Sequence, residues 1–181
     1  GGSLSGSYNT AVGRTSGLAM SSGANNTLVG YASGEAITTG ASNTFIGSAA
    51  GDANTTASNN TAVGSGALGV NTTGAQNVAI GMGCMSANTE GNDSIAMGVS
   101  ALDANTTGSN HVALGRQALQ ANTTASGNVA VGLSALKANT TGSSNVSVGT
   151  TALLNSTTAS SNTACGHQSM NACTTGGNNT A

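Results

Sequence analysis

Few side chains in this chain could do chemistry, and they do not form a recognisable set. The histidines are His111 and His167, and the cysteines are Cys84, Cys165 and Cys173. Cys165, His167 and Cys173 lie near one another in sequence and could imitate a metal site. A zinc site, however, needs a fourth ligand and a ligand spacing that are missing here. We therefore interpret these residues as local substitutions and expect no metal site and no cofactor.

The carboxylates and hydroxyls suggest no catalytic machinery either. No carboxylate pair, Ser-His-Asp set or Cys-His pair recurs or converges in the sequence, so we predict that the protein is not an enzyme. A polysaccharide-cleaving fibre, for example, would need a carboxylate pair. The segment 64–69 reads GSGALG and matches the dinucleotide-binding pattern G-x-G-x-x-G. That pattern needs a following helix, and Gly64 belongs instead to the repeat described below, so we interpret the match as coincidence.

The charge content excludes two classes of partner. The chain has 181 residues, only 3 Lys plus Arg against 5 Asp plus Glu, and a net charge of −2. So few basic residues argue against a nucleic acid or an anionic membrane surface as the partner. No apolar run approaches the roughly 18 residues of a membrane span, so we expect no membrane insertion.

The element that positions every other residue is a repeat of 17 residues without insertion or deletion. Ten full copies, numbered here as coils 1 to 10, begin at Asn9, Asn26, Asn43, Asn60, Asn77, Ser94, His111, Asn128, Asn145 and Asn162. We expect residues 1–8 to be a partial repeat or cap, residues 9–178 to be the repeats, and residues 179–181 to start a further copy of a longer fibre. A fixed period of this kind indicates one structural unit stacked on its neighbours.

Within one copy, counted from position 1 at the Asn, glycine and alternation predict the fold. Position 5 is always glycine, which predicts a corner: Gly13, Gly30, Gly47, Gly64, Gly81, Gly98, Gly115, Gly132, Gly149 and Gly166. The segments at positions 1–4 and 8–14 are rich in Asn, Thr and Val and too short for helices, so we predict two short strands per coil. The fold class is therefore all-β, a parallel β-solenoid, in which Asn at positions 1 and 12 should form hydrogen-bonded ladders.

Alternation also predicts which side chains face inward. The larger apolar residues at positions 4 and 9 should form the core: Val12, Val29, Ile46, Val63, Ile80, Met97, Leu114, Val131, Val148, Leu102, Leu119 and Leu136. Positions 2 and 11 should share that face. Position 3 should then point outward, and its small uncharged residues predict a subunit contact: Ala62, Ala79, Ala96, Ala113 and Ala130. A coil with so small a core also suggests association, so we expect a homo-oligomer.

Two polar features leave alternatives open. N-x-S/T sequons are glycan acceptors in a eukaryotic secreted protein, although ladders are the better interpretation in a bacterial or viral fibre. Among the residues that begin such sequons are Asn25, Asn54, Asn59, Asn71, Asn92, Asn105, Asn122, Asn139, Asn155 and Asn178. The regular Thr pairs near position 13 suggest an alternative function, an ice-binding solenoid with Thr rows spaced by about 4.8 Å.

The phrases N-V-A-I-G (residues 77–81), N-T-A-V-G (60–64) and S-I-A-M-G (94–98) resemble the YadA-like head repeats of trimeric autotransporter adhesins. The longer phrase A-L-x-A-N-T-T-G (101–108 and 135–142) is similar to repeats in phage tail fibres, notably cyanophage-like ones. The resemblance covers residues 9–181, although adhesin heads usually repeat at a shorter period. It implies a left-handed parallel β-roll, three chains around an axis, and an extracellular location on a virion or bacterial cell surface.

From these observations we expect a non-catalytic structural and adhesive segment of a homotrimeric extracellular fibre, either a phage tail fibre or an adhesin stalk or head. Its partners would be copies of itself and a glycan or protein of the host cell surface. Receptor contact would use the variable outward positions 6, 7, 10, 16 and 17.

Overall fold

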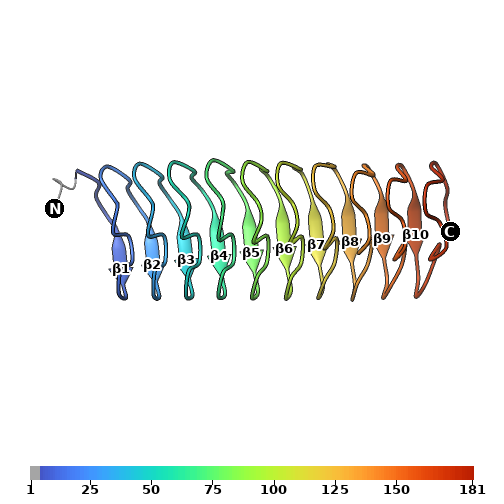
Figure 1. The fold of residues 1–181 in the computed structure, drawn as a ribbon, viewed down its shortest axis with the longest axis horizontal. Coiled ribbons are helices and arrows are strands. Elements are labelled where there is room, and N and C mark those ends of the chain that lie inside the picture. The colour runs from blue at the N-terminus through green and yellow to red at the C-terminus, as the bar shows by residue number, and fades with distance from the viewer. Residues whose placement is uncertain (1–4) are drawn as a thin grey trace.

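The computed structural model describes residues 5–181, which wind into a straight rod of stacked coils with the termini at opposite ends (Figure 1). Each coil contributes one strand of three residues. The strands are β1 (Thr10–Val12), β2 (Thr27–Val29), β3 (Thr44–Ile46), β4 (Thr61–Val63), β5 (Val78–Ile80), β6 (Ile95–Met97), β7 (Val112–Leu114), β8 (Val129–Val131), β9 (Val146–Val148) and β10 (Thr163–Cys165). No helix occurs among residues 5–181, and hence none that could cross a membrane.

The ten strands form one parallel sheet in sequence order. Every residue pairs with the residue one repeat later, as Val78 does with Ile95 and Ala79 with Ala96. The predicted all-β parallel solenoid is therefore confirmed, and each side chain lies on its counterpart in the next coil. At about 4.8 Å per strand, the ten strands make a sheet about 48 Å long.

Each coil turns at residues with positive φ, and not all of them are glycine. Position 5 has φ between 128° and 139° in the ten coils, a range that favours glycine. Positions 7, 9 and 17 are left-handed in every coil, including the buried Leu119 at φ 54°. The predicted second strand over positions 8–14 is therefore wrong, because the left-handed residue at position 9 lies within that region and the chain there forms turns.

The glycine corner also packs against the next coil. A Cβ on Gly132 would lie 2.6 Å from the carbonyl oxygen of Gly149, which is closer than any side chain can approach. Gly166, in the last full coil, has the same backbone conformation but nothing within 4 Å of such a Cβ. Glycine is therefore required at this corner both by its φ and by the close approach of the neighbouring backbone.

The core is a narrow column formed by positions 3, 8 and 9, with position 12 beside it. Leu102, Leu119 and Leu136 are fully buried, as predicted. The alternation of the strand, however, has the opposite phase to the one we predicted. Its middle residue, at position 3, points into the coil, and the residues at positions 2 and 4 point out.

Consequently, two of our predictions about the strands are wrong. The alanines expected at a subunit contact, Ala62, Ala79, Ala96, Ala113 and Ala130, are fully buried inside their own chain. The position-4 residues expected in the core are half-buried or exposed: Val12, Val29, Ile46, Val63, Ile80, Met97, Leu114, Val131 and Val148. Position 11 is also outside the core, since Val70 is 46% exposed.

The reason is the width of the coil, and coils 2 and 3 show it clearly. There position 3 carries a large residue, Leu28 or Phe45, and position 9 is glycine. A Cβ on Gly51 would overlap the Phe45 ring. From coil 4 onward the order is reversed: position 3 carries a small residue, such as Ala62, and position 9 carries a large one, such as Leu68. In coils 2–10 the interior accommodates one large side chain from positions 3 and 9, so the two residues vary together: where one is large, the other is small.

Candidate functional site: the outer face of the sheet

The largest regular feature on the rod is the outward side of the sheet, which we call the outer sheet face and define as positions 2 and 4 of the ten strands. The position-2 row is Thr10, Thr27, Thr44, Thr61, Val78, Ile95, Val112, Val129, Val146 and Thr163. The position-4 row runs from Val12 to Cys165 and is aliphatic in all but that last residue. Neither row contains a charged residue.

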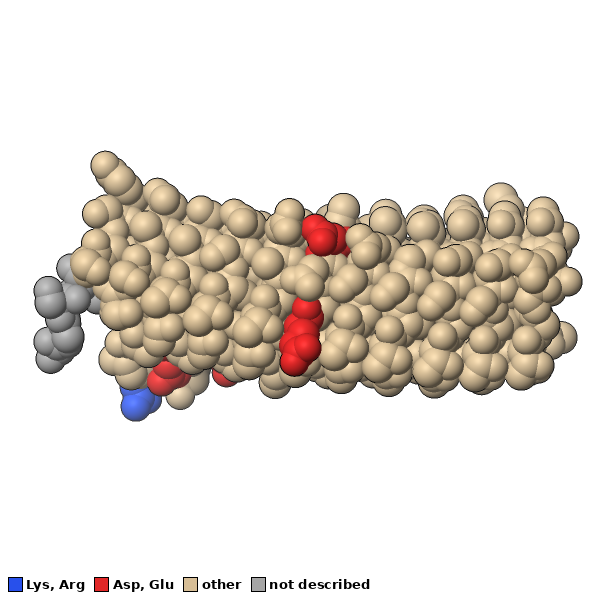
Figure 2. Space-filling view, turned by 90° about the horizontal axis from the view of Figure 1, so that it is seen from above, with Lys and Arg blue, Asp and Glu red and all other residues tan. Residues whose placement is uncertain are grey.

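These side chains are partly open to solvent. The exposed fractions reach 58% for Val12, 43% for Ile95 and 42% for Met97, while most other members are half-buried against their row neighbours. Two continuous uncharged rows therefore run along the whole sheet. Charged side chains are sparse elsewhere too, as the face of the rod in Figure 2 shows.

Two asparagine ladders fix the spacing of the coils beneath this face, as predicted. At position 1, Asn26 Oδ1 accepts the backbone N–H of Asn43 at 3.0 Å, and Asn26 Nδ2 donates to the Gly40 carbonyl across the coil at 2.9 Å. At position 12, Asn71 Nδ2 donates to Asn54 Oδ1 at 2.9 Å. The position-1 amides thus join one coil to the next and brace the strand against the opposite corner, whereas the position-12 amides join neighbouring coils and bond to a carbonyl three residues later.

The position-12 ladder runs from coil 3 to coil 8 and ends at a defect. Coil 9 carries Ser156 where the preceding coils carry Asn, and Ser156 is fully buried. Asn139 Oδ1 and Ser156 Oγ are both buried without a hydrogen-bond partner. Unpaired buried polar atoms are costly, so this junction is a weak point of the rod.

His111 replaces Asn in the position-1 ladder and reproduces its hydrogen bonds. Its Nδ1 accepts the backbone N–H of Asn128 at 3.3 Å, so Nε2 carries the proton and donates to the Ala125 carbonyl at 2.7 Å. The imidazole is 1% exposed. Burial lowers the pKa of His111, against a smaller opposing effect of these backbone hydrogen bonds. The arrangement is that of a neutral structural histidine and not of a metal ligand.

The threonines at position 13 use their hydroxyls internally. Thr106 Oγ1 donates to the Thr123 carbonyl at 3.1 Å, and the same bond recurs along the row. The threonines at position 14 are exposed instead: Thr39, Thr56, Thr73, Thr107, Thr124, Thr141, Thr158 and Thr175. Only one of each Thr pair therefore presents a free side chain to solvent.

The sequons divide in the same way. Those at position 12 are fully buried in the ladder, so their amides are closed to modification in the folded chain: Asn54, Asn71, Asn105, Asn122 and Asn139. Asn25, Asn59, Asn155 and Asn178 are exposed, and Asn92 is half-buried.

The remaining candidates for chemistry do not come together. No group of three or more His, Cys, Asp or Glu gathers anywhere in residues 5–181. Cys84 is fully buried, and burial raises the pKa of its thiol to about 12, which leaves it unreactive. Cys165 and His167 are exposed, whereas Cys173 is half-buried and its thiol contacts the Gly176 carbonyl. The strand ending at Val63 leads into turns and not a helix, as expected if Gly64–Gly69 binds no dinucleotide.

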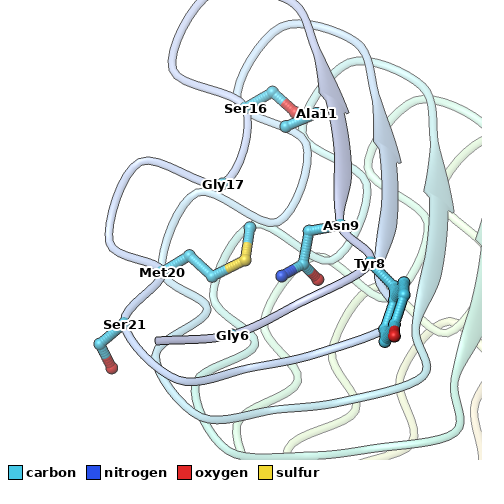
Figure 3. Close-up of a pocket in the computed structure, with 8 residues that line it drawn as sticks. All are labelled: Gly6, Tyr8, Asn9, Ala11, Ser16, Gly17, Met20 and Ser21. Atoms are coloured by element: carbon cyan, nitrogen blue, oxygen red, sulfur yellow. The ribbon is translucent and has the colours of Figure 1, made fainter. Parts of the chain in front are cut away.

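Two hollows on the surface result from the shape of the coils and not from a gathering of reactive side chains. One of about 400 Å³ opens at the first coil, where Asn9 and Met20 extend toward each other while Tyr8 points away (Figure 3). It is the open end of the core, since Ala11 and Gly17 leave positions 3 and 9 unfilled there. Another of about 520 Å³ follows the outside of positions 10 and 11 and includes Asp103 and Lys137. Neither gathers groups that could react together.

The feature missed by sequence reasoning is therefore the outer sheet face itself. Its residues were visible as two uncharged rows, but the prediction assigned them to the core. Comparison with models of protein families, with curated proteins and with solved structures finds no match to this chain. Its function has to be inferred from the geometry of this face.

Proposed function

We propose that the chain is a non-catalytic structural and adhesive segment of a homotrimeric extracellular fibre, on a virion or a bacterial cell surface. The observation that carries the proposal is the outer sheet face, with its two uncharged rows on every strand. The resemblance of the repeats to YadA-like adhesin heads and phage tail fibres agrees with it and suggests a left-handed coil. The rod would serve as a stiff spacer.

The size of the face supports association. A sheet about 48 Å long and three residues, or about 10 Å, wide presents a footprint of about 500 Å². The largest apolar patch on a typical monomer covers about 300–600 Å² and is often functional, and this face has a similar size. It is also below the roughly 800 Å² per partner of a standard interface, so a simple face-to-face pair would be small. In a closed ring of three chains each chain has two neighbours, so surface beside the face is buried as well as the face itself.

The periodicity of the face favours a second copy of this chain as its partner. Its side chains recur every strand, about 4.8 Å apart, over ten strands. A partner that fits them along the whole length must carry the same repeat. In a cyclic assembly whose axis runs along the rod, identical coils lie at the same level, so every coil meets its own copy. Association would then bury the aliphatic rows that the single chain leaves open.

The remaining surface suits a spacer with local recognition. The parallel strand pairing and the position-1 ladder connect every coil to the next, and the position-12 ladder adds bonds from coil 3 to coil 8, so the rod resists bending and local opening. Residues at positions 6 and 17 vary between coils and are largely exposed, as Tyr31 (54%) and Met82 (60%) illustrate at position 6. Contact with a surface glycan or protein would use such side chains and leave the ladders intact.

Cys165 provides a direct test, because it ends the position-4 row of the outer sheet face. In a Cys173→Ser background, a short bifunctional thiol reagent should link Cys165 of one chain to Cys165 of its neighbour, giving covalent pairs on a denaturing gel. The control moves the thiol off this face, to the exposed position 14, as Thr158→Cys with Cys165→Ser and Cys173→Ser. This control should give single chains. If Cys165 reacts with a monofunctional reagent but never links two chains, the proposed face is not the interface.

The alternative function, ice binding, is favoured by the exposed threonine row at position 14. Against it, the neighbouring position-13 hydroxyls donate to backbone carbonyls and give no second free row. Thermal hysteresis of the freezing point decides: a measurable gap between melting and freezing supports ice binding, and its absence at high protein concentration removes this alternative.

A further inference from the structure

The outer sheet face changes character along the rod, although its backbone does not. Position 2 is Thr in coils 1–4 and again in coil 10, whereas in coils 5–9 it is aliphatic: Val78, Ile95, Val112, Val129 and Val146. Position 4 stays aliphatic through all of coils 1–9. The face therefore has a half-polar section, at residues 9–76, and a fully aliphatic section, at residues 77–161.

The residues beyond the glycine corner change at the same place. Position 6 carries Arg14, Tyr31, Ser48 and Ser65 in coils 1–4. In coils 5, 6 and 8 it carries Met82, Val99 and Leu133, which are 60%, 39% and 45% exposed. Position 6 follows position 4 by only two residues, so these side chains widen the aliphatic section at the edge of the sheet. Arg116 in coil 7 and Thr150 in coil 9 are the exceptions.

The two sections should behave differently when copies meet. Burying an aliphatic row against another aliphatic row removes apolar surface from water without any polar cost. Burying a threonine row leaves hydroxyls that need partners, and water can supply these only if the chains do not close completely. The position-13 threonines satisfy their hydroxyls within the chain, but no such internal bond is present for Thr27, Thr44 or Thr61.

We propose that copies of this chain close on one another through the aliphatic section, coils 5–9, and that coils 1–4 are joined more loosely with water between their threonine rows. This inference rests on the proposed association through the outer sheet face. The occupant is a second copy because only the same repeat presents a matching side chain at every strand of this section. When the rotation axis runs along the rod, coil 7 meets coil 7 and the aliphatic sections coincide. The fibre segment then has a dry seam and a wetter, more compliant end.

Two matched substitutions test the inference, both at position 2 and both at half-buried sites that point away from the chain's own core: Val112→Asp in coil 7 and Thr44→Asp in coil 3. Mass and dissociation constant are measured by sedimentation for each variant and the natural chain. Circular dichroism checks that both variants keep the β-solenoid. We expect Val112→Asp to raise the dissociation constant at least 100-fold, because several carboxylates would meet in a dry seam. Thr44→Asp should change it less than 10-fold.

The outcomes separate this inference from the proposed function. If the natural chain is monomeric, the proposed function fails before any variant is compared. If both variants dissociate to the same extent, the face is the interface but its seam runs the full length, and the division into sections is wrong. If neither dissociates while the natural chain is trimeric, association uses another surface and the inference is likewise overturned.

Discussion

The exchange of sizes between positions 3 and 9 gives the sharpest prediction about the fold. Coil 3 combines Phe45 with Gly51, and coil 4 combines Ala62 with Leu68. The double variant Phe45→Ala/Gly51→Leu would give coil 3 the core of coil 4, since the residues at positions 8 and 12 are already the same in both coils. Each single change should be severe, and the pair should be mild.

The magnitudes follow from burial and conformation. Phe45 is fully buried, so Phe45→Ala should cost about 3–5 kcal/mol through the cavity it leaves. Gly51→Leu should cost about 1–3 kcal/mol from overlap with the Phe45 ring. Because φ at Gly51 is 56°, any side chain there also bears about 1–2 kcal/mol of left-handed strain. In the double variant only this strain remains, because the leucine fills the cavity. A favourable coupling of about 3 kcal/mol or more is expected.

The assay is urea unfolding followed by far-ultraviolet circular dichroism, with the free energy of unfolding extrapolated linearly for the natural chain, both single variants and the double variant. The reverse exchange in coil 4, Ala62→Phe/Leu68→Gly, is the matched control and should show coupling of the same sign. If the costs of the two single changes simply add in the double variant, the shared core volume is not what holds positions 3 and 9 together.

Three further predictions concern the ladders and corners. Folding lowers the pKa of His111, so the unfolded chain takes up a proton at a higher pH than the folded chain does. The free energy of unfolding should therefore fall as the pH drops below about 6.5. His111→Asn restores the usual ladder residue and should flatten that part of a plot of unfolding midpoint against pH. Ser156→Asn should raise the free energy of unfolding by about 1 kcal/mol more than Ser156→Ala, because both changes remove the unpaired Ser156 Oγ but only the Asn amide can donate to the unpaired Asn139 Oδ1. An Asn variant less stable than the Ala variant would show that coil 9 lacks the room for the amide. Gly132→Ala should lower the free energy of unfolding in urea by about 2 kcal/mol more than Gly166→Ala does. Both residues have a positive φ, but only the new Cβ at Gly132 would meet a carbonyl of the next coil. Equal losses would mean that φ alone selects glycine at this corner.

Much of the fold follows from the period alone. An unbroken repeat puts like residues on like, which is enough to predict parallel pairing, the glycine corners and the asparagine ladders. Asn71 above Asn54 is the expected arrangement, and the structure supplies the bond between their amides. The burial of Leu102 and Leu119 also followed from the repeat, since both lie at a position that is uncharged in every coil.

The phase of the strand could not be predicted, because the usual rule that larger apolar residues lie inside fails in so narrow a coil. Leu119 already fills the interior, so the strand can turn only a small residue such as Ala113 inward, and the larger Val112 and Leu114 remain outside. The prediction of a second strand is wrong for a different reason. Nothing about a leucine indicates a left-handed φ, yet Leu119 adopts one because the coil must turn there to bring its side chain into the core.

Because the alanine row is buried, the candidate interface is the outer sheet face, and the proposed fibre requires copies of the chain to meet there. Sedimentation equilibrium of the intact chain at several concentrations tests this most directly. The account predicts a single species of three times the 17.0 kDa chain mass that dissociates on Val112→Asp. A monodisperse species of 17.0 kDa at every concentration would contradict it.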